Sequence, residues 1–409
     1  MSATVAGTER HPWITHDGSA DEPVLAGARI LFVVNVDWFF LSHRLPLARA
    51  ARELGAEVCV ASTDTGQASR IRDEGLAFHP ITFSRKGSRL SEEASALFSL
   101  ASLYRRVRPD LVHHVTIKPV LYGSLAARAA AVPCVVNAIT GLGTMFSSEQ
   151  EARRFHMVIQ HLYRIALGRG CAIFQNPDDR ELMVDQGIVA ADRTVLIRGS
   201  GVDCDRFVPT PPPPGRPVVV LPSRMLWDKG VGTFVEAARL LRDRGCDARF
   251  VLAGAPDDGN PTMVPEACLR GWNDEGVVEW WGHQDDMPSL MARASVVTLP
   301  TFYKEGVPKV LLEAAAAGRP IVASDIPGCR EIVRDGENGT LVPAKSAEAL
   351  ATAIGELLAS PQLRKRYGEA GRRIALNEFT EGQVARQTMR LYHNLLHQPG
   401  APLSHLSGS

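Results

Sequence analysis

Short runs of consecutive apolar residues recur along the first half of the chain, with amphipathic stretches between them. The apolar runs occupy residues 29–35, 57–62, 111–115, 134–139, 171–174 and 194–197, and the amphipathic stretches include residues 44–54, 91–107 and 150–167. Strands that are buried on both faces and alternate with helices are typical of a parallel sheet covered by helices. The pattern therefore predicts a doubly wound α/β domain over residues 28–208.

A proline-rich segment interrupts this rhythm. Six of the nine residues from 209 to 217 are proline, which neither a helix nor a central strand tolerates, so we expect a stiff, extended linker. The apolar rhythm resumes at residues 217–221, 249–253, 277–281, 296–299 and 321–324, and three helical stretches close the chain near residue 397. We predict a second doubly wound domain over residues 218–380, with a ligand in the cleft between the domains, at the carboxyl ends of the strands.

The ends of the chain differ from the two domains. Residues 1–27 are polar and irregular, which predicts a flexible leader, and residues 398–409 predict a tail. Between the second domain and this tail, residues 381–397 predict a C-terminal helix, which we expect to pack back toward the first domain.

Composition narrows the classes of protein. The 409 residues are 45% hydrophobic and 22% charged, as in a globular chain with more than one core. Lys plus Arg and Asp plus Glu both number 45, and this balance argues against a nucleic-acid binder. No apolar run approaches the roughly 20 residues that cross a bilayer. The first residues lack the pattern of a signal peptide, and the seven cysteines are spread singly, so we expect free thiols and a cytoplasmic location.

Two cations stand at a predicted strand-to-helix turn in residues 223–230. Arg224 offers a bidentate fork and Lys229 a point charge, and together they suit a diphosphate. The alternative is a pair of solvated surface charges.

Two carboxylates flank the start of the helix predicted after residue 307. Pro308 fits the first helical position and Gly318 fits just past the end. Glu305 then lies in the preceding loop and Glu313 inside the helix, where eight residues span about 12 Å. Hydrolase carboxylates lie about 5–9.5 Å apart, so two separate contacts on one extended ligand fit better. The alternative is a carboxylate favoured by the helix dipole and a surface glutamate.

Backbone amides at the start of this helix add a candidate anion site. The N–H groups of Gly306 and Val307 are expected to point into the cleft at the positive end of the helix.

These motifs, together with residues 325–331, resemble the retaining glycosyltransferases of family 4, which have the GT-B fold of two facing Rossmann-like domains. The resemblance extends from Arg29 to about His397. Residues 35–44, 116–118 and 139–143 are similar to those of a bacterial subgroup that adds hexoses or N-acetylhexosamines to polyprenyl-diphosphate-linked sugars in O-antigen, capsule, exopolysaccharide or N-glycan assembly.

The resemblance implies a role for each matching residue. It also implies that the donor nucleotide is UDP and that the reaction needs no metal ion. Many family members place a histidine after a first-domain strand near the reacting sugar, whereas this sequence has Thr140-Gly141 in that region. The implied donor contacts are Arg224 and Lys229 on the diphosphate, Glu305 on the sugar, the backbone of Gly306, Val307 and Pro308 on sugar and phosphate, and Glu313 on the ribose.

Other residues leave alternatives open. Lys118, Thr140 and Gly141 are possible acceptor or sugar contacts, although Lys118 is equally well a structural residue and Gly141 a simple turn. Asp203 and Asp205 match the Asp-x-Asp pattern of metal-dependent enzymes, but they lie next to the proline linker, where a turn is the expected structure. No Gly-x-Gly-x-x-Gly follows the first strand, which argues against a dinucleotide oxidoreductase.

A basic segment favours contact with a membrane surface. Residues 81–170 contain twelve Lys and Arg against five Asp and Glu, and such residues attract an anionic leaflet. Interleaved apolar residues would dip into it. We therefore expect a peripheral enzyme at the inner face of the cytoplasmic membrane, unless the apolar residues are core and the arginines a solvated face. The residues concerned are Arg85, Lys86, Arg89, Arg105, Arg106, Arg108, Arg153 and Arg154, with Phe83, Leu90, Phe98, Leu100, Phe155 and residues 38–41.

The sequence thus predicts a metal-independent retaining glycosyltransferase with a nucleotide-sugar donor and a polyprenyl-diphosphate-linked sugar acceptor. The alternatives are another GT-B sugar-nucleotide enzyme, such as a 2-epimerase or a phosphorylase, and a non-catalytic sugar-nucleotide-binding subunit. The presence of Glu305, Arg224 and Lys229 argues against lost catalysis.

Overall fold

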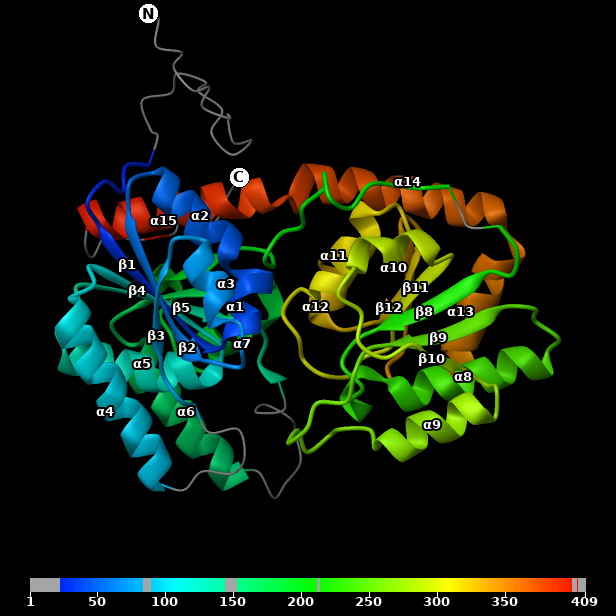
Figure 1. Ribbon diagram of the computed structural model, residues 1–409, viewed down its shortest axis with the longest axis horizontal. Helices are drawn as coiled ribbons and strands as arrows, with labels where there is room; N and C mark the ends of the chain where they lie inside the picture. The colour runs from blue at the N-terminus through cyan, green and yellow to red at the C-terminus, as the bar shows by residue number, and fades with distance from the viewer. Residues whose placement is uncertain (1–22, 84–89, 144–152, 212–213, 399–402, 404–409) are drawn as a thin grey trace, which may run out of the picture.

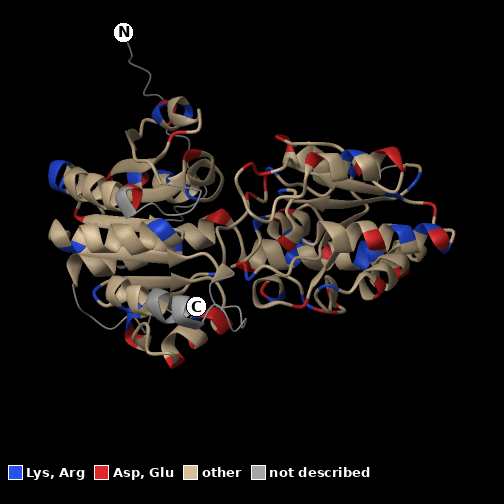
Figure 2. Ribbon diagram, turned by 90° about the horizontal axis from the view of Figure 1, so that it is seen from below, with Lys and Arg blue, Asp and Glu red and all other residues tan. Residues whose placement is uncertain are grey.

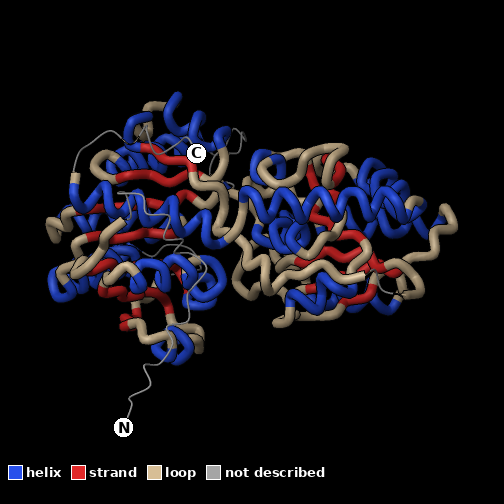
Figure 3. The backbone as a smooth tube through the Cα atoms, turned by 90° about the horizontal axis from the view of Figure 1, so that it is seen from above, coloured by secondary structure: helices blue, strands red, loops and turns tan. Residues whose placement is uncertain are grey.

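The computed structural model describes residues 23–83, 90–143, 153–211, 214–398 and 403. It contains two α/β domains that lie side by side, with the C-terminal helices running along one edge of both (Figure 1). Seen from above, the strands of each domain are enclosed by helices (Figure 3). The predicted pair of doubly wound domains is confirmed.

The first domain is built on a seven-stranded parallel sheet of order β3-β2-β1-β4-β5-β6-β7. Its strands are β1 (Arg29–Val36), β2 (Glu57–Thr63), β3 (Ala77–Pro80), β4 (Leu111–Val115), β5 (Cys134–Ile139), β6 (Cys171–Phe174) and β7 (Thr194–Leu196). Its helices are α1 (Asp37–His43), α2 (Leu45–Glu53), α3 (Ala68–Asp73), α4 (Leu90–Val107), α5 (Ile117–Ala129), α6 (Arg153–Leu167) and α7 (Pro177–Asp185).

The second domain repeats the plan with a six-stranded parallel sheet of order β10-β9-β8-β11-β12-β13. Its strands are β8 (Val218–Pro222), β9 (Arg249–Ala253), β10 (Glu279–Trp280), β11 (Val296–Leu299), β12 (Ile321–Ser324) and β13 (Gly339–Val342). Its helices are α8 (Val231–Asp243), α9 (Glu266–Asp274), α10 (Met287–Arg293), α11 (Lys309–Ala316), α12 (Pro327–Arg330), α13 (Ala347–Ala359) and α14 (Pro361–Glu378).

Alternate residues of each central strand serve two different cores. Ile30 and Phe32 of β1 face α2, whereas Leu31 and Val33 face α4 and α5. This explains why the strands read as continuous apolar runs rather than as apolar–polar alternation. Basic and acidic residues are interspersed over both domains (Figure 2), in keeping with the net charge of zero.

Some expectations based on apolar character were wrong. Phe83 and Leu100, expected on an exposed surface, are 5% and 0% exposed because the chain turns them toward the sheet. Phe98 on the outer side of α4 is 73% exposed. Arg85, Lys86 and Arg89 lie outside the described residues, as do the side chains of Leu90, Arg153, Arg154 and Phe155.

The predicted leader is too long at its inner end. Leu25 is buried in the core of the first domain, where it packs with residues of β1 and α15 (Glu381–His397). Residues 1–22 lie outside the described part of the chain. In the predicted tail, Leu403 is buried against the same core, and its backbone N–H donates to Asp192 O at 3.1 Å.

The last helix belongs structurally to the first domain. Val384, Met389, Tyr392 and Leu395 of α15 are buried in the same core as β1 and α2. The phenol of Tyr392 also forms a buried hydrogen bond with His113 of β4. The chain therefore crosses between the domains twice, once near Val202 and once near Thr380.

The two crossings are bonded to each other. Val202 N donates to Phe379 O at 2.8 Å, and Glu381 N donates to Val202 O at 3.1 Å. Thr380 and Gln383 form a capping box, which starts α15 anew directly after α14 ends. The interdomain hinge is thus a short hydrogen-bonded pair of segments rather than a single flexible link.

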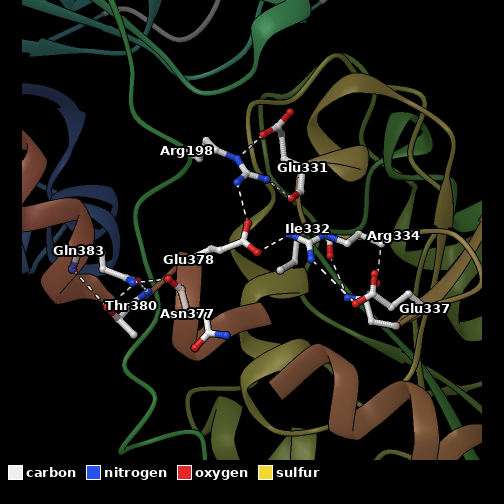
Figure 4. A network of polar contacts seen from close by, with 10 residues as sticks. Arg198, Glu331, Ile332, Arg334, Glu337, Asn377, Glu378, Thr380 and Gln383 are labelled. Carbon is white, nitrogen blue, oxygen red and sulfur yellow. Dashed lines mark hydrogen bonds and ion pairs between the residues drawn. The ribbon is translucent and has the colours of Figure 1, made fainter. Parts of the chain in front are cut away.

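Arg198 braces this hinge from the first domain (Figure 4). Its guanidinium binds the Glu331 carboxylate at 2.5 Å and the Glu378 carboxylate at 2.9 Å, and lies 4.6 Å from the ring of Phe379. Arg334 pairs with the other oxygen of Glu378. A single arginine therefore ties β7 to the ends of α12 and α14.

We expect Arg198→Met to lower the free energy of unfolding by about 2 kcal/mol, between the values for exposed and buried ion pairs. The change leaves two half-buried carboxylates without their shared cation. Urea unfolding measures this effect. Arg239→Met, which removes an exposed pair with Glu275, is the matched control and should cost less than about 0.5 kcal/mol. Equal losses in the two variants would contradict a bracing role.

Candidate functional site

A cavity of about 520 Å³ lies between the two domains. The first domain contributes the segments that follow β1, β4, β5 and β6, and the second contributes the turn after β8, the loop after β9 and the loop before α11. These are the carboxyl ends of the strands, where doubly wound sheets place their ligands. The volume falls within the roughly 300–1,000 Å³ range of small-molecule pockets.

Lys229 and Glu305 form an ion pair in the wall of this cavity. The Lys229 Nζ to Glu305 Oε2 distance is 2.6 Å, and the two side chains are 13% and 16% exposed. Glu305 Oε1 is also buried and has no hydrogen-bond partner among the described residues. This carboxylate oxygen therefore has unused capacity to accept a hydrogen bond.

A glycine positions the lysine. Gly230, directly after Lys229, has φ of +77°, and a Cβ there would lie 2.1 Å from Pro300 O. Only glycine fits this left-handed, tightly packed position. The turn between β8 and α8 therefore holds Lys229 close to the end of β11.

Arg224 lines the same cavity and pairs with a carboxylate that the sequence analysis did not single out. Its Nη1 donates to Asp257 Oδ2 at 2.5 Å, and Asp257 lies in the loop after β9. The Arg224 side chain is 47% exposed, so much of its surface remains accessible. The structure thus brings Arg224, Lys229 and Glu305 together around one cavity.

The sequence analysis predicted that the amides of Gly306 and Val307 point into the cleft as an anion site. This prediction was wrong, because both amides donate to groups of the first domain. Gly306 N donates to Thr140 O at 3.0 Å, and Val307 N donates to Gln175 Oε1 at 3.0 Å. One further bond joins Gly143 N to Lys304 O at 2.9 Å. Groups of the first domain occupy the two amides because the domains approach closely here.

Two glycines permit this approach. A Cβ on Gly306 would lie 2.0 Å from Gln175 Oε1, and a Cβ on Gly141 would lie 2.5 Å from Gly306 N. We call the contact between residues 140–143 and residues 304–307 the interdomain seam. Thr140 and Gly141 lie in this seam and also line the cavity. Pro308 also lines the cavity and caps α11, which begins at Lys309 rather than at the proline.

Glu313 lies apart from these residues. It is 8% exposed and is not among the residues that line the cavity. Burial raises its pKa to about 7, with Glu381 adding to the rise and Lys309 and Arg206 opposing it. Lys309 itself lies 3.7 Å from Glu381. Glu313 therefore belongs to a group of interacting charges with Lys309, Arg206 and Glu381 rather than to the cavity lining.

Lys118 lines the cavity at the start of α5 and forms an ion pair with Glu93 of α4 at 2.6 Å. The preceding residue, Thr116, has φ of +74° and ψ of 168°, a region that residues other than glycine rarely adopt. Thr116 also lines the cavity. The segment between β4 and α5 is thus a strained turn at the cleft.

Several cavity residues escaped the sequence analysis, among them Gln175, Asp257 and Lys309. Gln175 and Asp257 each follow an apolar strand, which is the signal that would have marked them as cleft residues. The Asp-x-Asp does not reach the cavity: Asp203 Oδ1 accepts from the amides of Asp205 and Arg206 in a turn.

No cluster of three or more His, Cys, Asp or Glu side chains that would hold a metal ion occurs within the described ranges. All seven cysteines are free thiols, and five of them are buried. Both His113 and His114 are buried.

Comparisons with protein families and with individual proteins both match this chain to glycosyltransferases over most of its length. Residues 29–176 match the family described as glycosyl transferase 4-like, and residues 216–360 match glycosyl transferases group 1. The chain is 28% identical over 380 residues to the N,N'-diacetylbacillosaminyl-diphospho-undecaprenol alpha-1,3-N-acetylgalactosaminyltransferase of Campylobacter jejuni, covering 87% of this chain and 98% of that protein. It is 27% identical to the putative glycosyltransferase EpsD of Bacillus subtilis, with 89% and 96% covered.

Solved structures share the fold. Sucrose-phosphate synthase of Thermosynechococcus elongatus superimposes with a TM-score of 0.76 at 20% identity, covering 90% of this chain and 99% of that one. HepE of Anabaena in complex with UDP-glucose gives 0.73 at 20% identity, with 90% and 100% covered.

The fold and the interdomain cavity define an enzyme of the GT-B class. The two family matches together span most of the chain, and the chain belongs to the family 4-like glycosyltransferases.

Glu313 should give folding stability a distinct pH dependence. Between about pH 4.5 and 7 the folded protein holds the proton of Glu313 more tightly than the unfolded chain does. The free energy of unfolding therefore falls as pH rises through this range, by up to about 3 kcal/mol. We expect Glu313→Gln to be more stable than the wild type at pH 8, with little difference at pH 4.5. Urea unfolding between pH 4.5 and 8 measures this difference in the free energy of unfolding, with the exposed Glu348→Gln as the control. If the free energies of Glu313→Gln and the wild type change with pH in parallel, the prediction is contradicted.

Proposed function

We propose that this enzyme transfers a hexose or N-acetylhexosamine, with retention, from a UDP-sugar to a sugar hydroxyl on a polyprenyl-diphosphate-linked acceptor. The observation that carries the proposal is the Lys229–Glu305 pair beside Arg224 in the interdomain cavity. The Campylobacter jejuni relative, whose name specifies a diphospho-undecaprenol-linked sugar, supports the acceptor class. The Anabaena structure with UDP-glucose, which shares the fold, supports the donor class.

The chemistry follows from the charges in the cavity. Arg224 and Lys229 would bind the donor diphosphate and stabilise the charge that develops as it leaves. Glu305 Oε1, which has no partner among the described residues, would accept from a donor-sugar hydroxyl. The bond between the anomeric carbon and the diphosphate oxygen breaks and its electron pair leaves with that oxygen. The bond from the anomeric carbon to the acceptor oxygen forms on the same face, and the acceptor proton passes to the leaving phosphate.

Incubating the purified protein with a panel of UDP- and GDP-sugars and prenyl-diphosphate-linked N-acetylhexosamines tests this function. We expect one new glycosidic bond whose anomeric configuration, read by NMR, equals that of the donor. Inversion, or epimerised donor without a new bond, would reject the proposal.

Three substitutions separate the proposed roles. Glu305→Ala and Lys229→Ala should each lower kcat by at least about 100-fold, the scale of a lost transition-state contact. Glu313→Ala should leave kcat nearly unchanged and affect mainly the donor KM, because Glu313 is buried and does not line the cavity where the reacting groups would lie. Lys365→Ala, at an exposed position on α14, is the control. Equal losses of kcat for Glu313→Ala and Glu305→Ala would contradict these assignments.

We propose that transfer needs no divalent metal, because Arg224 and Lys229 supply the countercharge to the diphosphate. Full activity is expected in EDTA. An activity lost in EDTA and restored by magnesium or manganese would overturn the proposal.

We also propose that the first domain contacts the inner face of the cytoplasmic membrane. No helix in the described part of the chain is long and apolar enough to span a bilayer. On α4, Phe98 is 73% exposed and Arg105 and Arg106 are exposed further along the same helix. An aromatic side chain beside cations is suited to an anionic interface.

Phe98→Ala should weaken binding to anionic vesicles several-fold, as measured by co-sedimentation at low ionic strength. High salt should weaken binding of the wild type, since it screens exposed charges. Leu376→Ala, at an exposed apolar position on α14 in the second domain, should bind as the wild type does. Indifference of the wild type to lipid charge would argue against membrane contact.

A further inference from the structure

The backbone on either side of Glu305 is held by the first domain. Gly143 N donates to Lys304 O at 2.9 Å, and Gly306 N donates to Thr140 O at 3.0 Å. Glu305 therefore lies in the middle of the interdomain seam, between two residues that are each hydrogen-bonded to the opposite domain. The place from which its carboxylate projects depends on the first domain, although the residue itself belongs to the second.

Gln175 forms the next bond along this loop. Its Oε1 accepts from Val307 N at 3.0 Å, and the residue lines the cavity. Of these three hydrogen bonds, the one to Gln175 alone has a side-chain acceptor, because the other two join backbone atoms. The Gln175 side chain is therefore the part of this contact that a substitution can remove without a change in the backbone.

The neighbours of Gln175 fix its position. The residue follows directly after β6, and Asn176 caps α7, where the Asn176 side chain accepts from Asp179 N at 2.8 Å. Gln175 is only 7% exposed. A buried side chain between a strand end and a helix cap is already ordered, so it holds another segment at little further cost in conformational entropy.

The loop that carries Glu305 is clamped from two sides. A Cβ on Gly306 would lie 2.0 Å from Gln175 Oε1, and a Cβ on Gly328 of α12 would lie 1.7 Å from Gly306 O. A larger residue at either position would push the loop away from its neighbour. The close approach of Gln175 to this loop is thus a feature that the sequence provides for, and a shift of Gly306 would also move Glu305.

An alternative role for Gln175 is to cover an anion site. Val307 lies just before α11, and the start of a helix favours a phosphate. A donor phosphate would then displace Gln175 from the Val307 amide. The clamp around Gly306 argues against this alternative, because the phosphate would have to move a buried side chain out of a tightly packed contact.

We propose that Gln175 is a positioning residue for the transfer reaction, which holds Glu305 in place on the donor sugar through the amide of Val307. This inference rests on the proposed transferase function. Lys229 orients the Glu305 carboxylate through Oε2, whereas Gln175 sets the backbone that carries it. The effect is large enough to measure, because a displacement of about 1 Å in a reacting group can cost about 100-fold in rate.

Substitution of Gln175 by methionine keeps the length of the side chain and removes the acceptor. Gln175→Met should lower kcat about tenfold, within the range for a misplaced catalytic group. The donor KM and the dissociation constant of UDP should stay nearly unchanged, because the contact acts on the transition state. Gln175→Glu, which keeps an oxygen at this position, should lose less kcat than Gln175→Met. Initial rates with the donor and acceptor that the wild type uses give these values.

A double-mutant cycle shows whether Gln175 acts through Glu305. In the Glu305→Ala background, Gln175→Met should lower the remaining kcat by less than about twofold, because no carboxylate is left to position. A residue that supports only the fold would lower kcat by the same factor in both backgrounds.

The controls use the same chemical change elsewhere. Gln186→Met alters an exposed glutamine at the end of α7, which accepts from Gln160 Nε2, and should leave kcat and KM unchanged. Thermal unfolding with and without UDP confirms that each variant is folded and binds the nucleotide. Gln175→Asn, which is one methylene shorter and withdraws the acceptor from Val307, replaces Gln175→Met if that variant does not fold.

Three results would overturn the proposal. The first is a Gln175→Met variant with the same kcat as Gln186→Met. The second is tighter binding of UDP by Gln175→Met than by the wild type, which would assign Gln175 to the cover of an anion site. The third is a tenfold loss that persists in the Glu305→Ala background. A wild type that forms no glycosidic bond with any donor rejects the proposed function, whereas an active wild type with an unaffected Gln175→Met rejects this inference alone.

Discussion

The hydrogen-bonded seam between the domains is the contact on which the rest of the cleft depends. Thr140 O and Gln175 Oε1 hold the amides of Gly306 and Val307, so the loop that carries Glu305 is fixed by groups of the opposite domain. The spacing between acceptor side and donor side is then set by backbone atoms rather than by flexible side chains. Glycine at position 306 is a geometric requirement, since a Cβ there would collide with Gln175.

A second constraint is electrostatic. In this structure each cation proposed for the diphosphate already faces a carboxylate, Lys229 with Glu305 and Arg224 with Asp257. A bound diphosphate would compete with these carboxylates rather than fill an empty basic site. The pairs keep the side chains oriented before the substrate arrives, which lowers the reorganisation needed when charge develops on the leaving group.

The sequence predicted the architecture well because the fold rests on a local signal. Ten of the thirteen strands coincide with apolar runs that are visible in the sequence alone. The sequence analysis missed β3 and β13, which are short and mixed in composition, and β10 covers only the middle of a longer predicted run. The cleft residues at strand ends were predicted for the same reason. Arg224, Lys229 and Glu305 all follow strands of the second sheet.

Long-range partners were not predictable in this way. The bond from Val307 to Gln175 joins residues 132 positions apart, and nothing in either segment indicates that the anion site would be capped. The apolar residues of the basic segment were misplaced because amphipathic patterning does not tell which aromatic faces the sheet: Leu100 is core and Phe98 is not. Trp38 lies at the cleft because α1 starts directly after β1, without an intervening loop.

The return of α15 to the first domain has a consequence for biosynthesis. Tyr392 and Leu395 complete the core that begins with Ile30 and Phe32, so that core joins the two ends of the chain. During synthesis, all strands of the second domain are made before α15, the last helix of the first domain. The domain made first is therefore the one finished last, and its open face stays exposed until α15 has left the ribosome and packed against it.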